Sequence, residues 1–125
     1  MQLLFETSEE HGLHRGLGLL PGRVERFRGN FKIPHMGWNR LEFLVHHPLF
    51  EGLKGGHAYF VHSYKVVPAA RSDLLAIVHY HGEVPAIVGR GNVYGMQFHP
   101  EKSGEMGLKL LGNFLALSSL KDVAW

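Results

Sequence analysis

Residues 74–100, LLAIVHYHGEVPAIVGRGNVYGMQFHP, restrict the fold of this chain more than any other segment. They contain three short runs of branched, aromatic and other apolar residues, which His81-Gly82 and Arg90-Gly91-Asn92 separate. Such runs are typical of β-strands, and Gly and Asn favour the tight turns that join antiparallel neighbours. We therefore predict antiparallel hairpins over this part of the chain.

Further strands are predicted earlier in the sequence. Residues 57–68, HAYFVHSYKVVP, are rich in aromatic and branched side chains and end at a proline, so they predict the clearest strand of the chain. Residues 24–27 predict a shorter one. Residues 32–39, KIPHMGWN, predict a loop, and residues 46–56, HHPLFEGLKGG, predict a short helix or a turn.

Helices are predicted at both ends of the chain. Residues 1–10, MQLLFETSEE, place apolar residues before acidic ones and predict a helix, although no capping residue precedes it. From Gly104 onward the apolar residues follow the helical period, and one face collects Met106, Leu110, Leu111, Phe114 and Leu117. We find no repeat or linker, so residues 1–125 are predicted to form a single domain.

Composition narrows the class of protein. With 45% hydrophobic and 19% charged residues the chain is a folding sequence, and its formal charge of +2 without a basic tract does not demand nucleic acid. The absence of cysteine excludes disulfides and thiolate metal sites. The first residues lack the features of a signal peptide, and no apolar run approaches the roughly 18 residues of a membrane helix. We expect a cytoplasmic protein with no membrane contact.

His99 and Glu101 flank Pro100 and are the first candidates for chemistry. Proline biases the preceding residue toward extended geometry, in which residues i and i+2 point to the same face. A carboxylate beside an imidazole fixes its tautomer and raises the basicity of its other nitrogen, as in the base and orienting group of a nucleophilic triad. The simpler interpretation of three such residues taken alone is an ordinary surface turn.

Two other kinds of site are weighed against this one. The chain has 10 histidines, but their spacing matches no zinc motif, and His79 with His81 would share a strand face only as surface decoration. Residues 23–32, RVERFRGNFK, interleave basic and aromatic side chains, which is compatible with a nucleic-acid surface but favours a solvated strand edge with two core aromatics. No phosphate-binding glycine motif is present, so no cofactor is expected.

Six segments, in this order, resemble the class I glutamine amidotransferases: MQLLFETSEE, GLGLLPGRVERF, PHMGWN, YFVHSY, RGNVYGMQFHPEKSG and GLKLLGNF. The resemblance covers essentially the whole chain. PHMGWN and YFVHSY are most similar to the glutaminase subunits of imidazole glycerol phosphate synthase, an enzyme of histidine biosynthesis. The resemblance implies an α/β fold, a three-layer sandwich around a mixed sheet. This chain would hold its C-terminal, more antiparallel part, without the strand and elbow that carry the nucleophile.

The resemblance also implies catalytic roles. His99 would be the base and Glu101 its orienting carboxylate, serving a cysteine thiolate that attacks the carboxamide of glutamine, releases ammonia and leaves a thioester for water to hydrolyse. In the family pattern this cysteine comes just before the segment that begins at Met1. A chain without it is expected to be inactive and poorly stable alone.

Substrate and partner contacts are carried over in the same way. Gln2 and Glu10 resemble ligands of the substrate L-glutamine, two helical turns apart on one face, and Ser63 and Tyr64 resemble the segment whose backbone holds its α-carboxylate. His62 beside them is interpreted as structural. The positions that resemble the interface with the cyclase subunit, a (β/α)8 barrel that forms a heterodimer with the glutaminase, are Trp38, Asn39, Tyr59 and Lys102.

Three alternative functions and one alternative place for Trp38 remain open at this point. A catalytically dead module that keeps the cyclase interface fits the missing cysteine equally well. Another class I amidotransferase, supplying ammonia to a different synthase, is disfavoured by PHMGWN. Trp38 is also compatible with a place in the core. A metal-binding protein is the most distant alternative.

Overall fold

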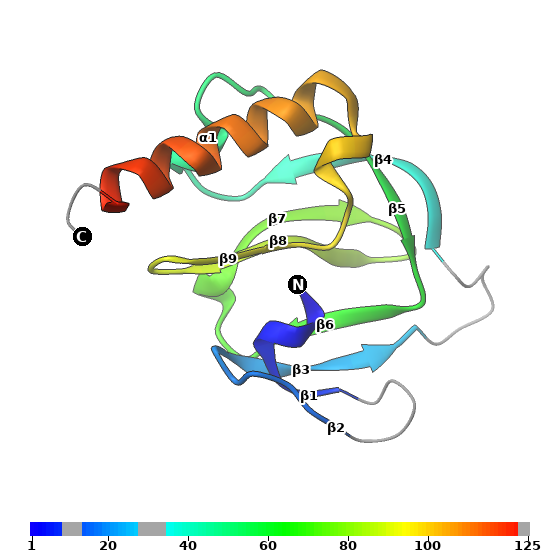
Figure 1. Ribbon diagram of the computed structural model, residues 1–125. Coiled ribbons are helices and arrows are strands. Elements are labelled where there is room, and N and C mark those ends of the chain that lie inside the picture. The colour runs from blue at the N-terminus through cyan, green and yellow to red at the C-terminus, as the bar shows by residue number, and fades with distance from the viewer. Residues whose placement is uncertain (9–13, 28–34, 123–125) are drawn as a thin grey trace.

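The computed structural model describes residues 1–8, 14–27 and 35–122 of the chain. Its elements form three layers, which Figure 1 shows from the side: helix α1 (Gly104–Asp122), a five-stranded sheet in the order β5-β4-β7-β8-β9, and a four-stranded sheet in the order β2-β1-β3-β6. The helix covers one face of the five-stranded sheet, and the four-stranded sheet lies on the other side. No helix of the described residues is long and apolar enough to cross a membrane.

The five-stranded sheet is antiparallel throughout. Its strands are β4 (His35–Phe43), β5 (Gly56–His62), β7 (Leu74–His79), β8 (Glu83–Arg90) and β9 (Val93–Met96). The predicted hairpins β7-β8 and β8-β9 are confirmed. Their turns use left-handed backbone, at His81 with φ 54° and at Gly91 with φ 59°, which is the conformation that glycine accepts without steric cost.

The four-stranded sheet is mixed. It contains β1 (Phe5–Ser8), β2 (His14–Arg15), β3 (Leu20–Arg26) and β6 (Tyr64–Pro68), and β1 and β3 run parallel while the other pairs are antiparallel. The strand predicted over residues 57–68 is therefore divided at Ser63: β5 belongs to one sheet and β6 to the other. This bend carries the chain from layer to layer.

Two groups of buried side chains hold the layers together. One includes Leu49, Phe60 and Leu110 and fills the space between α1 and the five-stranded sheet. The other joins the two sheets through Phe5, Val24, Val66, Leu74, Ile77 and Val88. Strands β7 and β8 contribute to both groups and are buried on both faces, as their nearly continuous apolar sequences indicate.

Helix α1 packs as its period predicts. Leu110 is fully buried, and Met106, Phe114 and Leu117 pack against the same core, whereas Leu108 and Leu115 on the other side are exposed. At its first turn the backbone comes so close to residue 100 that a Cβ on Gly107 would collide with the carbonyl of Pro100. The predicted helix is confirmed, and so is its packed face except for Leu111, which is partly exposed and lies outside the core. The start of the helix is fixed to the segment of His99.

Two predictions of local structure are wrong. Residues 2–4 form a single 3-10 turn, η1 (Gln2–Leu4), and the chain then enters β1, where Phe5 is fully buried and pairs with Leu20 of β3. Residues 35–39 belong to strand β4 instead of a loop, because their backbone pairs with β5 from His35 opposite His62 onward. In both places pairing with a distant strand outweighs the local sequence preference.

The short turns elsewhere agree with expectation. The segment predicted as a short helix or turn contains the 3-10 turn η2 (Pro48–Phe50), which the His47 ring caps by accepting a hydrogen bond from the Leu49 N–H. A second turn, η3 (Arg71–Asp73), leads into β7. The buried Asp73 carboxylate accepts two hydrogen bonds of 2.9 Å from Arg90, which fixes this turn to the end of β8.

Candidate functional site

His99 and Glu101 lie side by side, as predicted. The imidazole Nδ1 is 3.0 Å from Oε1 of Glu101, and both side chains are about half exposed, at 51% and 56%. His99 has extended backbone, φ −98° and ψ 101°, and Pro100 opens the 3-10 turn η4 (Pro100–Lys102). The pairing is therefore made by this turn, which folds Glu101 back toward the ring, and not by alternation along a strand.

The chemistry of this pair follows from its hydrogen bond. The backbone N–H of Glu101, together with His99 and Lys102, lowers the pKa of the Glu101 carboxyl, so this group is charged and accepts a hydrogen bond from Nδ1–H of His99. With Nδ1–H committed to the carboxylate, Nε2 of His99 holds a lone pair that can accept a proton. The geometry therefore provides a general base with an orienting group.

Ser103 fixes this turn to the sheet. Its hydroxyl donates a 2.7 Å hydrogen bond to the carbonyl of His99 and accepts one of 3.2 Å from the N–H of Tyr59 in β5. The side chain is buried at 2% exposure. Sequence reasoning did not single out Ser103; the available signal was a small hydroxyl residue directly before a predicted helix, where a side chain often bonds the backbone.

A second polar group lies at the bend between the two sheets. Nε2 of Gln2 donates hydrogen bonds to the carbonyl of Tyr64, at 3.3 Å, and to Oε1 of Gln97, at 3.1 Å. The carbonyl of Ser63 accepts a bond from the N–H of Phe27. The structure thus brings Gln2 and Tyr64 together, two of the predicted substrate residues. It adds Gln97, which sequence reasoning missed and which stands two residues before His99.

Glu10 lies outside the described residues. Its predicted relation to Gln2, two turns along one helix face, does not hold, because Gln2 belongs to η1 and the chain continues as strand β1. The amide of Gln2 is held at the bend because the residues around it pack against strand β9. Met1 and Leu4, on either side of it, pack so close to β9 that a Cβ on Gly95 would touch both.

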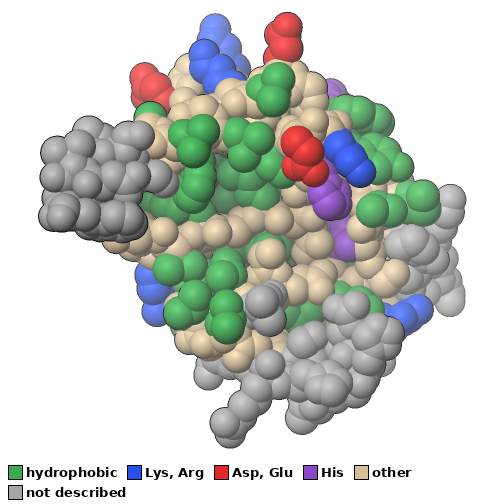
Figure 2. Space-filling model, in the orientation of Figure 1, with side chains coloured by type: hydrophobic (Ala, Val, Ile, Leu, Met, Phe, Trp, Pro, Cys, Tyr) green, Lys and Arg blue, Asp and Glu red, His purple; other side chains and the backbone are tan. Residues whose placement is uncertain are grey.

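Of the predicted partner residues, Trp38 and Asn39 point to opposite faces of β4, whereas Tyr59 belongs to β5 and Lys102 to η4. Trp38 is 56% exposed, and its ring lies against that of Tyr59 with centroids 5.7 Å apart. Met36 and Val61, which pair across the two strands, are exposed as well, and Lys102 is exposed in η4. Figure 2 shows exposed hydrophobic side chains beside acidic, basic and histidine side chains on one face of the molecule. Trp38 is therefore a surface residue and not part of the core.

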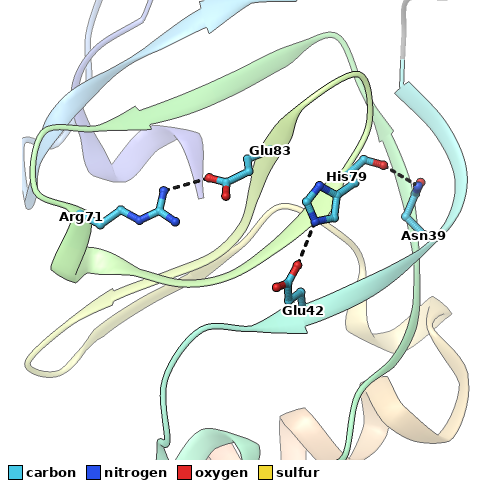
Figure 3. A network of polar contacts seen from close by, with 5 residues as sticks. All are labelled: Asn39, Glu42, Arg71, His79 and Glu83. Carbon is cyan, nitrogen blue, oxygen red and sulfur yellow. Dashed lines mark hydrogen bonds and ion pairs between the residues drawn. The ribbon is translucent and has the colours of Figure 1, made fainter.

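Asn39 points to the opposite side of β4. Its Oδ1 lies 2.6 Å from Nε2 of His35, and its Nδ2 donates a 3.4 Å bond to the carbonyl of His79. Figure 3 shows this contact together with the exposed pair of His79 and Glu42, whose Nε2 and Oε2 are 2.8 Å apart. The side chain of Asn39 is thus engaged within the protein.

Among the described residues no three His, Asp or Glu side chains converge as metal ligands would. His79 ends β7, whereas His81 lies in the following turn, so the two do not share a strand face. The remaining pair in Figure 3, Arg71 and Glu83, is an exposed ion pair of 2.9 Å between η3 and β8.

Comparison with known proteins adds three findings. The sequence profile of the family "Glutamine amidotransferase class-I" matches residues 1–117. The imidazole glycerol phosphate synthase subunit HisH of Geobacillus sp. (strain WCH70) is 56% identical over an alignment of 123 residues that covers 94% of this chain and 58% of that protein. The subunit of the same name from Bacillus subtilis (strain 168) is 48% identical over an alignment 129 residues long, gaps included, that covers 98% of this chain and 61% of that protein.

The fold is also found among solved structures. A crystal structure of a glutamine amidotransferase superposes with a TM-score of 0.59 at 23% identity, over 90% of this chain and 55% of the other. The chain therefore has the fold of these proteins in its described layers, and it spans about 58 to 61% of the length of the curated relatives it matches.

Proposed function

This chain belongs to the class I glutamine amidotransferase family, and we propose that it takes part in the hydrolysis of glutamine to glutamate and ammonia. The ammonia would pass to the cyclase subunit of imidazole glycerol phosphate synthase, in histidine biosynthesis. The observation that carries this proposal is the 3.0 Å contact between His99 and Glu101 on a turn fixed to the sheet. It is supported by the relatives, which are named as subunits of that synthase.

In the proposed reaction His99 is the proton carrier. It accepts the proton of a cysteine thiol, the thiolate attacks the carboxamide carbon of glutamine, and the imidazolium gives the proton to the departing amino group, which leaves as ammonia. His99 then deprotonates a water molecule that hydrolyses the thioester to glutamate, and the thiol is regenerated. The 125 residues contain no cysteine, so this thiol is not among them, and the chain alone is expected to be inactive.

The substrate contacts proposed for this chain lie at the bend between the sheets. The amide of Gln2 and the backbone of Ser63 and Tyr64 would hold the glutamine, with Glu10 on its α-ammonium group. The hydrogen bonds that join Gln2, Tyr64 and Gln97 support this assignment. They connect the amide of Gln2 and the backbone of Tyr64 to Gln97, which is two residues before His99 in the sequence. Gln97 joins this set as an anchor for the Gln2 side chain.

The proposed partner surface is the outer face of β4 and β5 beside η4. Trp38, Tyr59 and Lys102 would contact the (β/α)8 barrel of the cyclase in a cytoplasmic heterodimer. The support is the exposed ring of Trp38 against the partly buried ring of Tyr59, with exposed Met36 and Val61 nearby, since exposed apolar patches of this kind mark interaction surfaces. Asn39 would act from beneath this surface, because its side chain is turned inward.

A second candidate function is a binding module that regulates or scaffolds the cyclase without hydrolysing glutamine. The observation in its favour is an exposed aromatic surface in a chain whose 125 residues provide no cysteine nucleophile. Both functions require binding to the cyclase, and only the first requires a thiol from elsewhere in the natural protein.

The deciding experiment begins with the intact mass and N-terminal sequence of the natural protein from its source cells. The second step is to measure ammonia release from glutamine by that protein in complex with the cyclase. A longer chain that contains a cysteine and releases ammonia establishes the glutaminase. A protein that binds the cyclase without releasing ammonia identifies the binding module, and failure to bind this cyclase points to another class I amidotransferase.

A further inference from the structure

A pair of histidines is buried at the end of the β4-β5 ladder. His35 has no exposed surface and His62 is 7% exposed, and Nδ1 of His35 lies 2.9 Å from Nε2 of His62. The two residues are direct cross-strand partners, the first of β4 and the last of β5. The proposed reaction uses neither ring, although imidazoles are seldom enclosed completely unless they are hydrogen-bonded.

Aromatic rings hold both imidazoles in place. The His35 ring is stacked between Tyr80 and Phe60, with centroid distances of 4.1 and 4.9 Å and interplanar angles of 20° and 15°. The ring of Phe27 lies 5.2 Å from that of His62. Packing on these sides leaves the rings little freedom to turn, so their nitrogens keep the directions in which they make hydrogen bonds.

The pair joins two parts of the proposed site. At one end Nδ1 of His62 is 2.7 Å from the carbonyl of Tyr64, the same oxygen that accepts a hydrogen bond from Gln2. At the other end Nε2 of His35 is 2.6 Å from Oδ1 of Asn39. A continuous chain of hydrogen bonds therefore runs from β4, beneath the exposed Trp38 surface, to the bend that carries the substrate segment.

The chemistry of the acceptors fixes the direction of these bonds. A carbonyl only accepts, so Nδ1 of His62 must carry its proton, and its Nε2 then accepts the Nδ1–H of His35. Burial lowers the pKa of His62 to about 4 and lowers that of His35, so both rings are neutral near pH 7. Two neutral rings carry two N–H groups in all. The three contacts, from Tyr64 to His62, from His62 to His35 and from His35 to Asn39, would need three N–H groups if an oxygen stood at both ends. The Tyr64 end is thus fixed, and the Asn39 end requires its amide to be turned over, so that Nδ2 faces Nε2 of His35 in place of its 3.4 Å bond to the His79 carbonyl.

We propose that His62 is a positioning residue of the glutamine site: its Nδ1–H holds the Tyr64 carbonyl in place, and His35 secures the tautomer that makes this possible. This inference rests on the proposed function, since it takes Gln2 and Tyr64 as substrate contacts. It assigns to His62 a role in substrate binding through Tyr64, with no contact of its own to the reacting atoms.

Two amide substitutions separate positioning from packing. In His62→Asn the amide nitrogen takes the place of Nδ1 and can still donate to Tyr64, whereas in His62→Gln it takes the place of Nε2 and cannot. Both variants remove an imidazole from the same cavity, so a merely structural role predicts equal effects. Positioning predicts that, in the natural protein bound to its cyclase, KM for glutamine stays within about threefold for His62→Asn and rises about tenfold for His62→Gln, with kcat changed less.

A matched control accounts for general loss of stability. Leu49 is fully buried in η2 and none of its recorded polar contacts reaches the bend. Leu49→Ala removes core packing and is expected to lower the unfolding midpoint while leaving KM for glutamine unchanged. A rise of KM in this variant equal to that of His62→Gln would overturn the assignment.

The tautomer can be measured directly in the wild-type protein. Nitrogen NMR of the imidazole rings is expected to show His62 protonated at Nδ1 and unprotonated at Nε2 at pH 7. The opposite tautomer overturns the inference even if both variants fail to fold, and so does an equal KM in the two His62 variants. A wild-type complex that does not hydrolyse glutamine instead overturns the proposed function, and the inference with it; wild-type activity with equal variants overturns the inference alone.

Discussion

The two histidine sites of this chain make the same kind of hydrogen bond in opposite surroundings. At each, Nδ1 of an imidazole faces an oxygen at 2.7 to 3.0 Å, the carbonyl of Tyr64 for His62 and the carboxylate of Glu101 for His99. His62 is enclosed by aromatic rings, and His99 is half exposed at the surface. The difference separates two tasks: a ring that must keep one proton in one place is buried, and a ring that must exchange protons is open to substrate and solvent.

The hydrogen-bond acceptors of the two histidines also differ, one being charged and the other neutral. Glu101 is a charged group, so it stabilises the imidazolium that forms when His99 takes up a proton. Tyr64 offers a neutral carbonyl, and no carboxylate in the described residues has a recorded contact with the buried pair, so protonation of His62 is disfavoured by its loss of solvation. Each site therefore favours the protonation behaviour that its proposed task needs.

The largest effect is expected at the exposed histidine. His99→Ala in the natural protein, assayed with its cyclase, should lower ammonia release by about 10³-fold or more, because the thiol loses its base. The unfolding midpoint should stay close to that of the wild type, since the side chain is half exposed. Retention of even a tenth of the wild-type rate would remove His99 from its assigned role.

The next effect tests the buried histidine through pH. Burial depresses the pKa of His62 from 6.5 to about 4, so the unfolded chain binds a proton over this range while the folded chain does not. Stability should therefore be greatest above pH 6.5, fall as pH decreases toward 4 by on the order of 3 kcal/mol, and fall no further from this group below that pH. Urea unfolding of the natural protein at pH 7, 6 and 5 measures the slope.

His62→Asn serves as the control for this dependence, because it removes the titrating ring and keeps a donor for Tyr64. The part of the pH slope between 6.5 and 4 that belongs to His62 should disappear in this variant. An unchanged slope would assign the dependence to other groups.

How much of this comparison the sequence predicts depends on distance along the chain. His99 and Glu101 are two residues apart, and Gly82 and Gly91 mark the two hairpin turns locally. The contact of His99 with Glu101, the hairpins and helix α1 could therefore all be predicted. Residues 5–8 and 35–39 take their structure from pairing with other strands, β3 and β5, which no local preference reports. The contact of Gln2 with Gln97 spans 95 residues and could not be predicted for the same reason.

The resemblance to a known family identified some of the residues that local sequence preference could not bring together. It assigned Gln2 and Tyr64 to one site although they lie far apart in the sequence and the segment of Gln2 suggested a helix, and the structure places them in hydrogen-bond contact. It interpreted His62 as a structural residue, because a sequence motif identifies the histidine but does not show which groups its two ring nitrogens contact. The physical chain from Asn39 to Tyr64 became visible only when both strands were in register.

A smaller effect is expected from the residue that fixes the exposed site to the sheet. Ser103→Ala leaves the His99 carbonyl and the Tyr59 N–H without this partner, which should cost about 1 to 2 kcal/mol of stability. Because the turn is also loosened, kcat should decrease while KM for glutamine changes little, the opposite of the result expected for His62→Gln. Urea unfolding and steady-state ammonia release measure the two effects, and a variant that changes KM alone would contradict this division of roles.

The smallest effect is expected from a third histidine, which has the same kind of contact as His99 but no proposed task. His79 lies 2.8 Å from Glu42, and both side chains are more than half exposed. Exposed ion pairs contribute little to stability, because solvent and salt screen them and ordering two side chains costs entropy. His79→Ala should therefore leave both ammonia release and the unfolding midpoint within error of the wild type. A clear loss of activity in this variant would mean that an exposed histidine and carboxylate in contact do not by themselves identify the base, and the assignment of His99 would then rest on its turn and on Ser103.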